Sequence, residues 1–258
     1  MKNKIAWVLT FIALTVGGYI LAIYLPILAP GLYFDYQTEY KQYSIYSDRS
    51  INRGISFMME EVTSKLQPIE IYSGQEEFSI YLCYEPGKYR WFSKQMNMNH
   101  ESQGMTVEPL GYVFINLHRI GKIGQMYGDR YPYSLISGKA THIITHELMH
   151  VLITRELGML DSRKLPDWKR EGYAEYGASL HSKSQDTSYS FRKNVNAFLN
   201  GYYDEVKPIH RVYLKHELMV EYLITVKGIT FSRLMNVTFN QDAIWQELKA
   251  WMQQNHRK

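Results

Sequence analysis

The chain is poor in cysteine: Cys83 is the single cysteine among its 258 residues. An intrachain disulfide is therefore excluded, so the fold must be stabilised by an apolar core or by a bound ion. Cys83 lies in the apolar, strand-like run 78–84, where a cysteine most simply serves as a small buried side chain.

An excess of one charge is also absent. The 29 basic and 25 acidic side chains leave a formal net charge of only +4. No stretch gathers lysine and arginine into the stripe that follows a phosphate backbone, and the aromatic residues, although 14% of the chain, carry no RNA-binding signature. We therefore expect no nucleic-acid partner.

One long apolar run is present, from Ile5 to Ala29. About twenty such residues form a helix that crosses a bilayer, whereas the apolar core of a cleaved secretory signal has only about 7–15. Lysines precede the run and acidic residues follow it, which favours a cytoplasmic N-terminus. The sequence predicts a single-pass cell-membrane anchor with the rest of the chain outside the cytoplasm. The alternative is secretion after cleavage near Ala29-Pro30-Gly31.

Beyond this run the sequence predicts an α+β fold. Strand patterns come first and helical patterns dominate from residue 137, so we expect a small strand-containing lobe, then a mostly helical lobe, with a metal cleft between them. The predicted divisions are a transmembrane segment at 1–30, a tyrosine-rich connector at 31–50 and one domain at 51–258. The expected elements are a helix at 51–66, strands within 69–84 and 111–117, a loop at 95–104, and helices at 141–157, from 165 onward, and near 187–206, 209–227 and 241–255.

The segment His146-Glu147-Leu148-Met149-His150 has the side chains of a metal site. On a helix, residues four apart share a face, so both imidazoles can bind one ion while Glu147 projects beside it. Three protein ligands around Zn²⁺ leave a position for water, whose pKa falls to about 7, and a neighbouring carboxylate can accept the proton. The motif predicts a zinc hydrolase. The alternative is a chance helix with two surface histidines.

A second helix supplies candidates for the third ligand. Leu165-Pro166-Asp167 is typical of a helix start, and Glu171 and Glu175 follow four residues apart on one face. One carboxylate would bind the metal, and the other would accept the free N–H of a ligand histidine and fix its tautomer. His142, one turn before His146, is interpreted as a groove-rim or hydrogen-bonding residue, because three histidines on successive turns cannot all bind one zinc alongside a distant glutamate.

The sequence HELMH followed by PDWKREGYAEY resembles the gluzincin branch of HExxH zinc metallopeptidases, which contains thermolysin and the M1 aminopeptidases. The resemblance covers about residues 135–180 and is closest to M1-like and peptidase MA-like domains. It implies that Glu171, separated from His150 by 20 residues, is the third zinc ligand and that Glu175 is the supporting acid. No G-x-M-E-N segment precedes the motif, so the resemblance favours an endopeptidase acting on peptides or proteins.

Gluzincins often use a tyrosine or histidine from a later segment to stabilise the oxyanion. Tyr213 is the preferred candidate, because it falls in a helix-like segment downstream of Glu171. The full set of candidates is His210, Tyr213, His216 and Tyr222.

Two further points stay open at the level of sequence. The strand 111–117 is either the sheet edge along which an extended substrate lies or an ordinary core strand. The alternative function is a non-catalytic zinc-binding domain that recognises a partner at the cell surface. The intact Glu147 argues against that alternative, because a site that has lost catalysis usually loses this residue.

Overall fold

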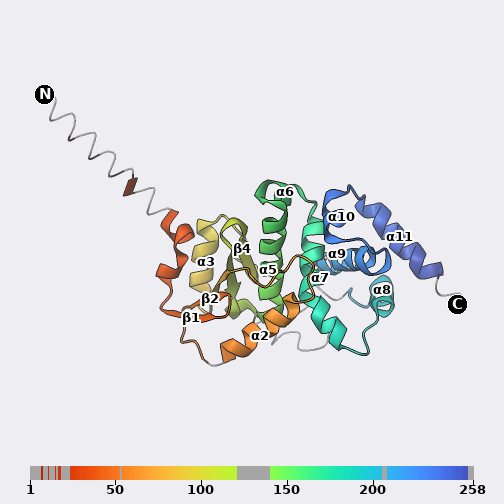
Figure 1. Ribbon diagram of the computed structural model, residues 1–258, viewed down its shortest axis with the longest axis horizontal. Helices are drawn as coiled ribbons and strands as arrows, with labels where there is room; N and C mark the ends of the chain where they lie inside the picture. Colours follow the sequence, from red (N-terminus) through yellow and green to blue (C-terminus); the bar gives the residue numbers. More distant parts are fainter. Residues whose placement is uncertain are drawn as a thin grey trace.

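The computed structural model describes residues 7, 11, 15, 17, 18, 24–52, 54–120, 140–204 and 208–254. The described chain is α+β, as the sequence predicts: a mixed five-stranded sheet with helices on its faces precedes a region of helices alone (Figure 1). Figure 1 places the sheet at one end of the molecule and α11 (Gln241–Gln254) at the other.

The sheet has the strand order β1-β2-β3-β5-β4, so β1 and β4 form its two edges. The three inner strands run parallel, and each edge strand pairs antiparallel with its neighbour. Parallel pairs need crossover connections, and these contain α2 (Gly54–Leu66) and α3 (Pro86–Gln95). The strands are β1 (Tyr36–Tyr40), β2 (Tyr43–Ser47), β3 (Phe78–Cys83), β4 (Gly104–Val107) and β5 (Tyr112–Asn116).

Side chains alternate between the two faces along each strand, and helices cover both faces of the inner strands. Ile80 and Leu82 of β3 pack in a cluster with residues of α2 and of α5 (Ala140–Leu157). Tyr81 and Cys83, on the opposite face, pack in a second cluster with aromatic residues of α3. α5 therefore lies against the sheet on one side and leaves its other side for the helical region.

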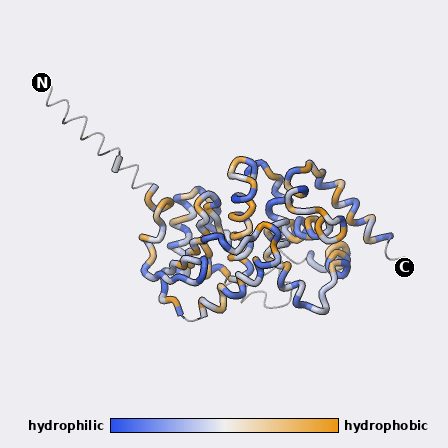
Figure 2. Tube along the Cα trace, viewed as in Figure 1, coloured by the Kyte–Doolittle hydropathy of each residue, from blue (hydrophilic) through white to orange (hydrophobic). Residues whose placement is uncertain are grey.

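The helical region is joined to the sheet through α7 (Asp167–Gln185), which packs against both α5 and α9 (Pro208–Glu221). α7 and α9 approach closely at Gly172, where a Cβ atom would lie 2.6 Å from the carbonyl oxygen of His216. Figure 2 shows apolar and polar residues mixed in this half of the molecule, and α7 buries every residue from Gly172 to Ser179 because it lies between α5 and α9. The other elements are η1 (Pro30–Tyr33), η2 (Glu108–Leu110), α6 (Met159–Lys164), α8 (Phe191–Leu199), the π-helical turn η3 (Tyr222–Val226) and α10 (Phe231–Asn236).

Several elements differ from the sequence prediction. β1 and β2 form within residues 31–50, which we had interpreted as a connector, and the side chains of β2 alternate between buried and half-buried. β4 begins at the end of the expected loop 95–104 and is only four residues long, too short for an alternating pattern to be recognised. α3 was also not expected, since this ten-residue helix has only three buried residues.

The structure corrects the prediction of a membrane-spanning helix over Ile5–Ala29. Among the residues that the structure describes, no helix is both long and apolar enough to cross a membrane. The consecutive helical residues described in this run are 24–28, and η1 begins at Pro30 directly afterwards. Most of residues 1–23 lie outside the described residues, and the predicted single-pass anchor and cell-membrane localisation are withdrawn.

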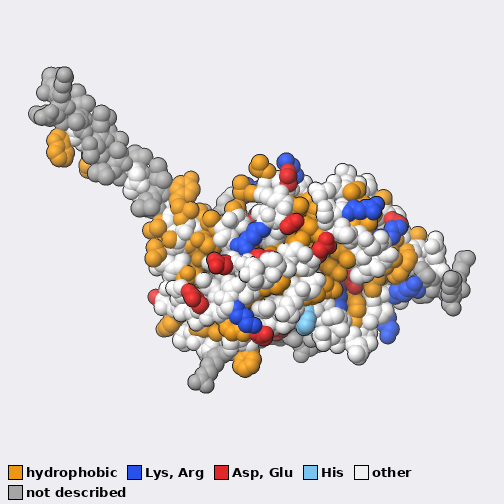
Figure 3. Space-filling view, in the orientation of Figure 1, with side chains coloured by type: hydrophobic (Ala, Val, Ile, Leu, Met, Phe, Trp, Pro, Cys, Tyr) orange, Lys and Arg blue, Asp and Glu red, His pale blue; other side chains and the backbone are white. Residues whose placement is uncertain are grey.

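The surface carries charges of both signs. Figure 3 shows acidic and basic side chains interspersed over the face in view, with apolar side chains gathered where the first described helical residues join the sheet half. Leu28 and Leu32 belong to this segment and are 57% and 74% exposed. Neither sign of charge dominates this face.

Candidate metal centre

The HELMH motif lies on α5, where the predicted helix forms almost as expected, over Ala140–Leu157 rather than 141–157. α5 is buried on nearly every side, because the sheet covers one side and α2 and α7 cover others. His146, Glu147 and His150 are each about nine-tenths buried. Their imidazoles and carboxylate therefore lie in a largely dry interior, where charged and polar groups need partners.

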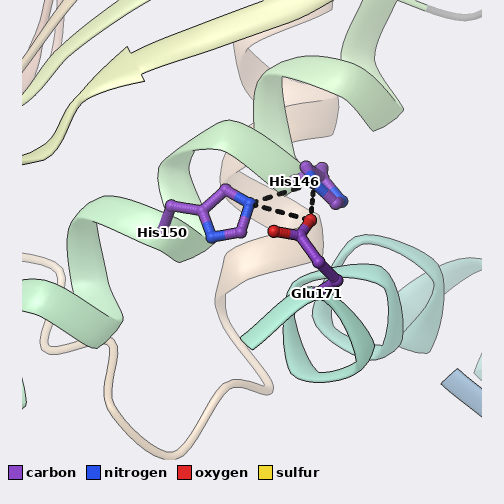
Figure 4. A group of neighbouring side chains, drawn as sticks. All are labelled: His146, His150 and Glu171. Carbon is purple, nitrogen blue, oxygen red and sulfur yellow. Dashed lines mark hydrogen bonds and ion pairs between the residues drawn. The ribbon is translucent and has the colours of Figure 1, made fainter. Parts of the chain in front are cut away.

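The second carboxylate-bearing helix is α7. It begins at Asp167, directly after Pro166, which is the helix start that the sequence predicts. The acid in its first turn complements the helix dipole. Glu171 follows one turn later and points at α5, where its carboxylate meets both motif histidines (Figure 4).

Three ligand atoms converge between α5 and α7 (Figure 4). His146 Nε2 and His150 Nε2 are 3.1 Å apart, and Glu171 Oε2 lies 3.4 Å from each of them. Ligands at about 2.0–2.1 Å from a tetrahedral zinc ion are separated by about 3.3 Å from one another. The residues therefore fit Zn²⁺ in both donor type and spacing, and they are the one such group among the described residues.

The carboxylates change the proton affinity of this cluster. Burial alone lowers the pKa of His146, but the negative charges of Glu175 and Glu171 outweigh it and hold that pKa well above its ordinary value. Burial acts to raise the pKa of Glu171, yet contact with His150 and His146 lowers it well below the usual range. The site thus attracts positive charge, which protons supply when no metal is bound and a divalent cation can supply instead.

Glu175 lies one turn beyond Glu171 on α7 and contacts a different nitrogen. Its Oε1 is 3.3 Å from His146 Nδ1, and its Oε2 is 2.9 Å from His142 Nε2. Burial opposes ionisation of Glu175, but the positive charge of His146 and the hydrogen bond from His142 lower its pKa below the usual range. Of the two interpretations given to His142, the structure shows the hydrogen-bonding one.

Arg170 is a site residue that sequence reasoning did not identify. Its Nη2 lies 3.3 Å from Glu171 Oε1, the oxygen that does not face the histidines. The two oxygens of Glu171 are therefore divided between the guanidinium and the histidine pair. An arginine next to the ligand glutamate in the sequence is the only signal that could have suggested this pairing.

Glu147 is held by the edge strand β4. Thr106 Oγ1 donates a hydrogen bond to Glu147 Oε2 and lies 3.3 Å from the backbone carbonyl oxygen of Glu147. At Gly104 a Cβ atom would lie 2.6 Å from Glu147 Oε1, so the carboxylate occupies space that this glycine leaves free. Neither β4 residue carries a recognisable sequence signal, because the contact depends on which strand lies against α5.

Tyr213 lies on α9 with its ring centroid 6.4 Å from that of His146. Burial and the nearby carboxylates of Glu171 and Glu175 raise the pKa of Tyr213 to about 12, so its hydroxyl remains a hydrogen-bond donor at neutral pH. Two of the other oxyanion candidates have partners of their own: His216 is hydrogen-bonded to Gln241, and Tyr222 packs against Trp251.

Of the two interpretations given to residues 111–117, the structure shows the ordinary core strand. β5 (Tyr112–Asn116) lies between β3 and β4 and so cannot be a sheet edge. The edge beside the motif is β4, which contacts α5 through Gly104 and Thr106. The sequence did not indicate this edge, because β4 begins at the end of the expected loop 95–104.

Comparison with known proteins adds no assignment: no family model matches the chain, and no curated protein matches it. The chemistry of the centre therefore rests on the residues and distances given above.

Proposed function

We propose that the protein is a zinc-dependent metallopeptidase of the gluzincin kind that the sequence resembles. The observation that carries this proposal is the convergence of His146 Nε2, His150 Nε2 and Glu171 Oε2 at separations of 3.1–3.4 Å. Glu147 follows His146 directly on α5 and projects about 100° round the helix from it, with its carboxylate hydrogen-bonded to Thr106 of β4. Two histidines and a glutamate with an adjacent carboxylate suit hydrolysis better than a purely structural site, which normally has four protein ligands.

The protein residues then have distinct tasks. When bound, Zn²⁺ would supply a water of lowered pKa and would polarise a carbonyl oxygen. Glu147 would accept a proton from the attacking water and would later donate it to the leaving amine. Thr106 donates a hydrogen bond to Oε2 of Glu147, and Oε1 lies against Gly104, so β4 fixes the orientation of this carboxylate. Tyr213 donates a hydrogen bond to the developing oxyanion.

The substrate class follows from the position of β4. Among the described residues no strand pairs with the outer side of β4, so an extended peptide could add to the sheet there. An added strand would run beside Glu147, which is in contact with β4. No motif that anchors a substrate amino terminus accompanies the site, and endopeptidase action is therefore favoured.

The substitution Glu147→Gln tests the proposal. Glutamine has nearly the same shape but cannot accept the proton, so we expect zinc content to stay at the wild-type level while hydrolysis falls about 10²–10⁴-fold. The measurement is cleavage of a quenched fluorescent peptide library by the zinc-loaded full chain. A matched control is Glu156→Gln at the exposed C-terminal end of the same helix, which should leave cleavage unchanged.

Two outcomes would contradict the proposal. Near-normal turnover by the Glu147→Gln variant would remove this residue from the chemistry. A wild-type protein that binds zinc yet cleaves no peptide in the library would instead favour a non-catalytic zinc-binding domain.

A further inference from the structure

We propose that His142 is a positioning residue of the metal centre, which acts on His146 through Glu175. This inference rests on the proposed function only in assuming that the centre binds zinc. His142, His146 and His150 repeat every four residues along α5, and Glu171 and Glu175 do so along α7. The two rows face each other, so each carboxylate lies between two histidines.

Among the described residues, Glu175 is the hydrogen-bond partner of the His142 side chain. His142 is 1% exposed, and its Nε2 lies 2.9 Å from Glu175 Oε2. Its Nδ1 has no hydrogen-bond partner among the described residues. An unprotonated Nε2 would set a lone pair against those of the carboxylate, so the geometry assigns the proton to Nε2 and makes His142 the donor.

Glu175 lies between His142 and the proposed ligand His146. Its second oxygen, Oε1, makes an ion-pair contact of 3.3 Å with His146 Nδ1, which has no hydrogen-bond partner in the described part of the chain, and an imidazole bound to metal through Nε2 would present its N–H on this side. Glu175 is 7% exposed, so water does not readily replace a lost donor. The hydrogen bond from His142 holds Oε2, which sets the position of Oε1, and in the metal-bound form Oε1 would accept the His146 N–H and orient the ring.

Loss of the His142 donor should therefore weaken metal binding. Glu175 would turn toward another donor, and the His146 ring would lose its support. Removing a group that hydrogen-bonds a ligand directly typically costs 10–100-fold in metal affinity. Because His142 acts one hydrogen bond further away, we expect the lower end of that range, about a tenfold rise in the zinc dissociation constant.

The experiment measures zinc affinity of the full chain by competition with a chromophoric chelator, so it needs no substrate. His142→Phe keeps a planar ring but removes the donor, whereas His142→Gln restores an N–H. The matched control is His181→Phe on α7, ten residues from Glu171 and thus about 15 Å along the helix. A double-mutant cycle with Glu175→Gln separates an effect through the carboxylate from an effect of packing.

The proposal predicts about tenfold weaker binding in His142→Phe, near-normal binding in His142→Gln and in His181→Phe, and no further loss when His142→Phe is added to Glu175→Gln. Unchanged affinity in His142→Phe, or equal losses in the wild-type and Glu175→Gln backgrounds, would overturn it while leaving the zinc site in place. A folded wild-type chain that binds no zinc would instead overturn both this inference and the proposed function.

Discussion

Glu171 and Glu175 lie one turn apart on α7, yet their surroundings give them different chemistry. Glu171 Oε2 meets the two Nε2 atoms that face each other, while Glu175 reaches the far side of the His146 ring and His142. The four-residue spacing predicts only that both carboxylates face the same way. Which carboxylate contacts which nitrogen depends on how far α7 is shifted along its axis relative to α5. Helix packing determines this shift, so residue spacing alone does not tell which glutamate is the third ligand and which is the supporting acid.

Tyr213 allows a test at the level of one hydroxyl. Tyr213→Phe removes the proposed oxyanion donor and keeps the ring, so we expect kcat to fall about 10²–10³-fold with zinc content unchanged. Because the pKa of Tyr213 is raised to about 12, its hydroxyl stays protonated over the neutral and mildly alkaline range. An alkaline loss of wild-type activity below that pKa therefore does not come from Tyr213.

The measurement is steady-state kinetics with a peptide identified from the library, and Tyr202→Phe, at a residue 61% exposed on the surface, is the control. A Tyr213→Phe variant with wild-type kcat would show that this hydroxyl does not act on the oxyanion.

At the scale of elements, a buried ionic network links α7 to α9. Lys183 Nζ lies 2.7 Å from Glu217 Oε1 and 2.5 Å from Glu221 Oε2, and Tyr189 donates to the other oxygen of Glu221. Ser179 donates to Glu217, which is fully buried. Burial raises the pKa of Glu217 even with Lys183 beside it. Among the described residues, Lys183 is thus the cation that pairs with both buried acids. It lies on α7, the helix that carries Glu171.

Lys183→Met should therefore destabilise the fold. The substitution leaves Glu217 and Glu221 buried without their cation, a change that costs about 3 kcal/mol of unfolding free energy. The pKa of Lys183 is raised by both acids despite its burial, so its contribution is complete below the ordinary lysine pKa and is lost only as the pH rises through the raised value. The difference between wild type and variant should shrink as the pH falls, because Glu217, whose pKa is already raised by burial, can take up a proton when its cation is gone.

Urea denaturation measures this difference. Lys164→Met is the control, because Lys164 is 74% exposed and its pair with Asp161 contributes little. If both variants lose the same small amount of stability, the network is not what holds α7 against α9.

The elements differ in how much of them the sequence could predict. α5 and α7 are long helices, α7 has a clear start signal at Pro166-Asp167, and both begin within one residue or two of the expected positions. β4 is four residues long and pairs with a strand that follows it, so nothing local predicts its place beside Glu147. The apolar run Ile5–Ala29 shows the opposite failure: its composition predicted a spanning helix, and the described residues contain none.

At the scale of the whole molecule, metal binding and folding should be coupled. The chain has no disulfide, and its candidate metal centre joins α5, which lies on the sheet, to α7, which packs against α9. A ligand that binds only the folded state adds about 4 kcal/mol when its concentration is a thousand times the dissociation constant. For a chain of this size each kcal/mol shifts Tm by about 2–4 °C.

We therefore expect chelation of zinc to lower Tm by about 10 °C in differential scanning calorimetry. The gain from zinc should shrink as the pH falls, because His146 must lose its proton to bind metal and its pKa is raised by Glu175 and Glu171. A Tm that does not respond to chelation of zinc-loaded protein would show that the centre does not couple the two halves.

The most direct test is the zinc content of the purified, folded full chain, measured by elemental analysis beside its Glu171→Ala and Glu147→Gln variants. We predict about one zinc ion per chain in the wild type and in Glu147→Gln, and a large loss in Glu171→Ala, since only Glu171 of the two is a ligand. A folded wild-type chain without stoichiometric zinc would contradict the account, and zinc retained by Glu171→Ala would contradict the assignment of the third ligand.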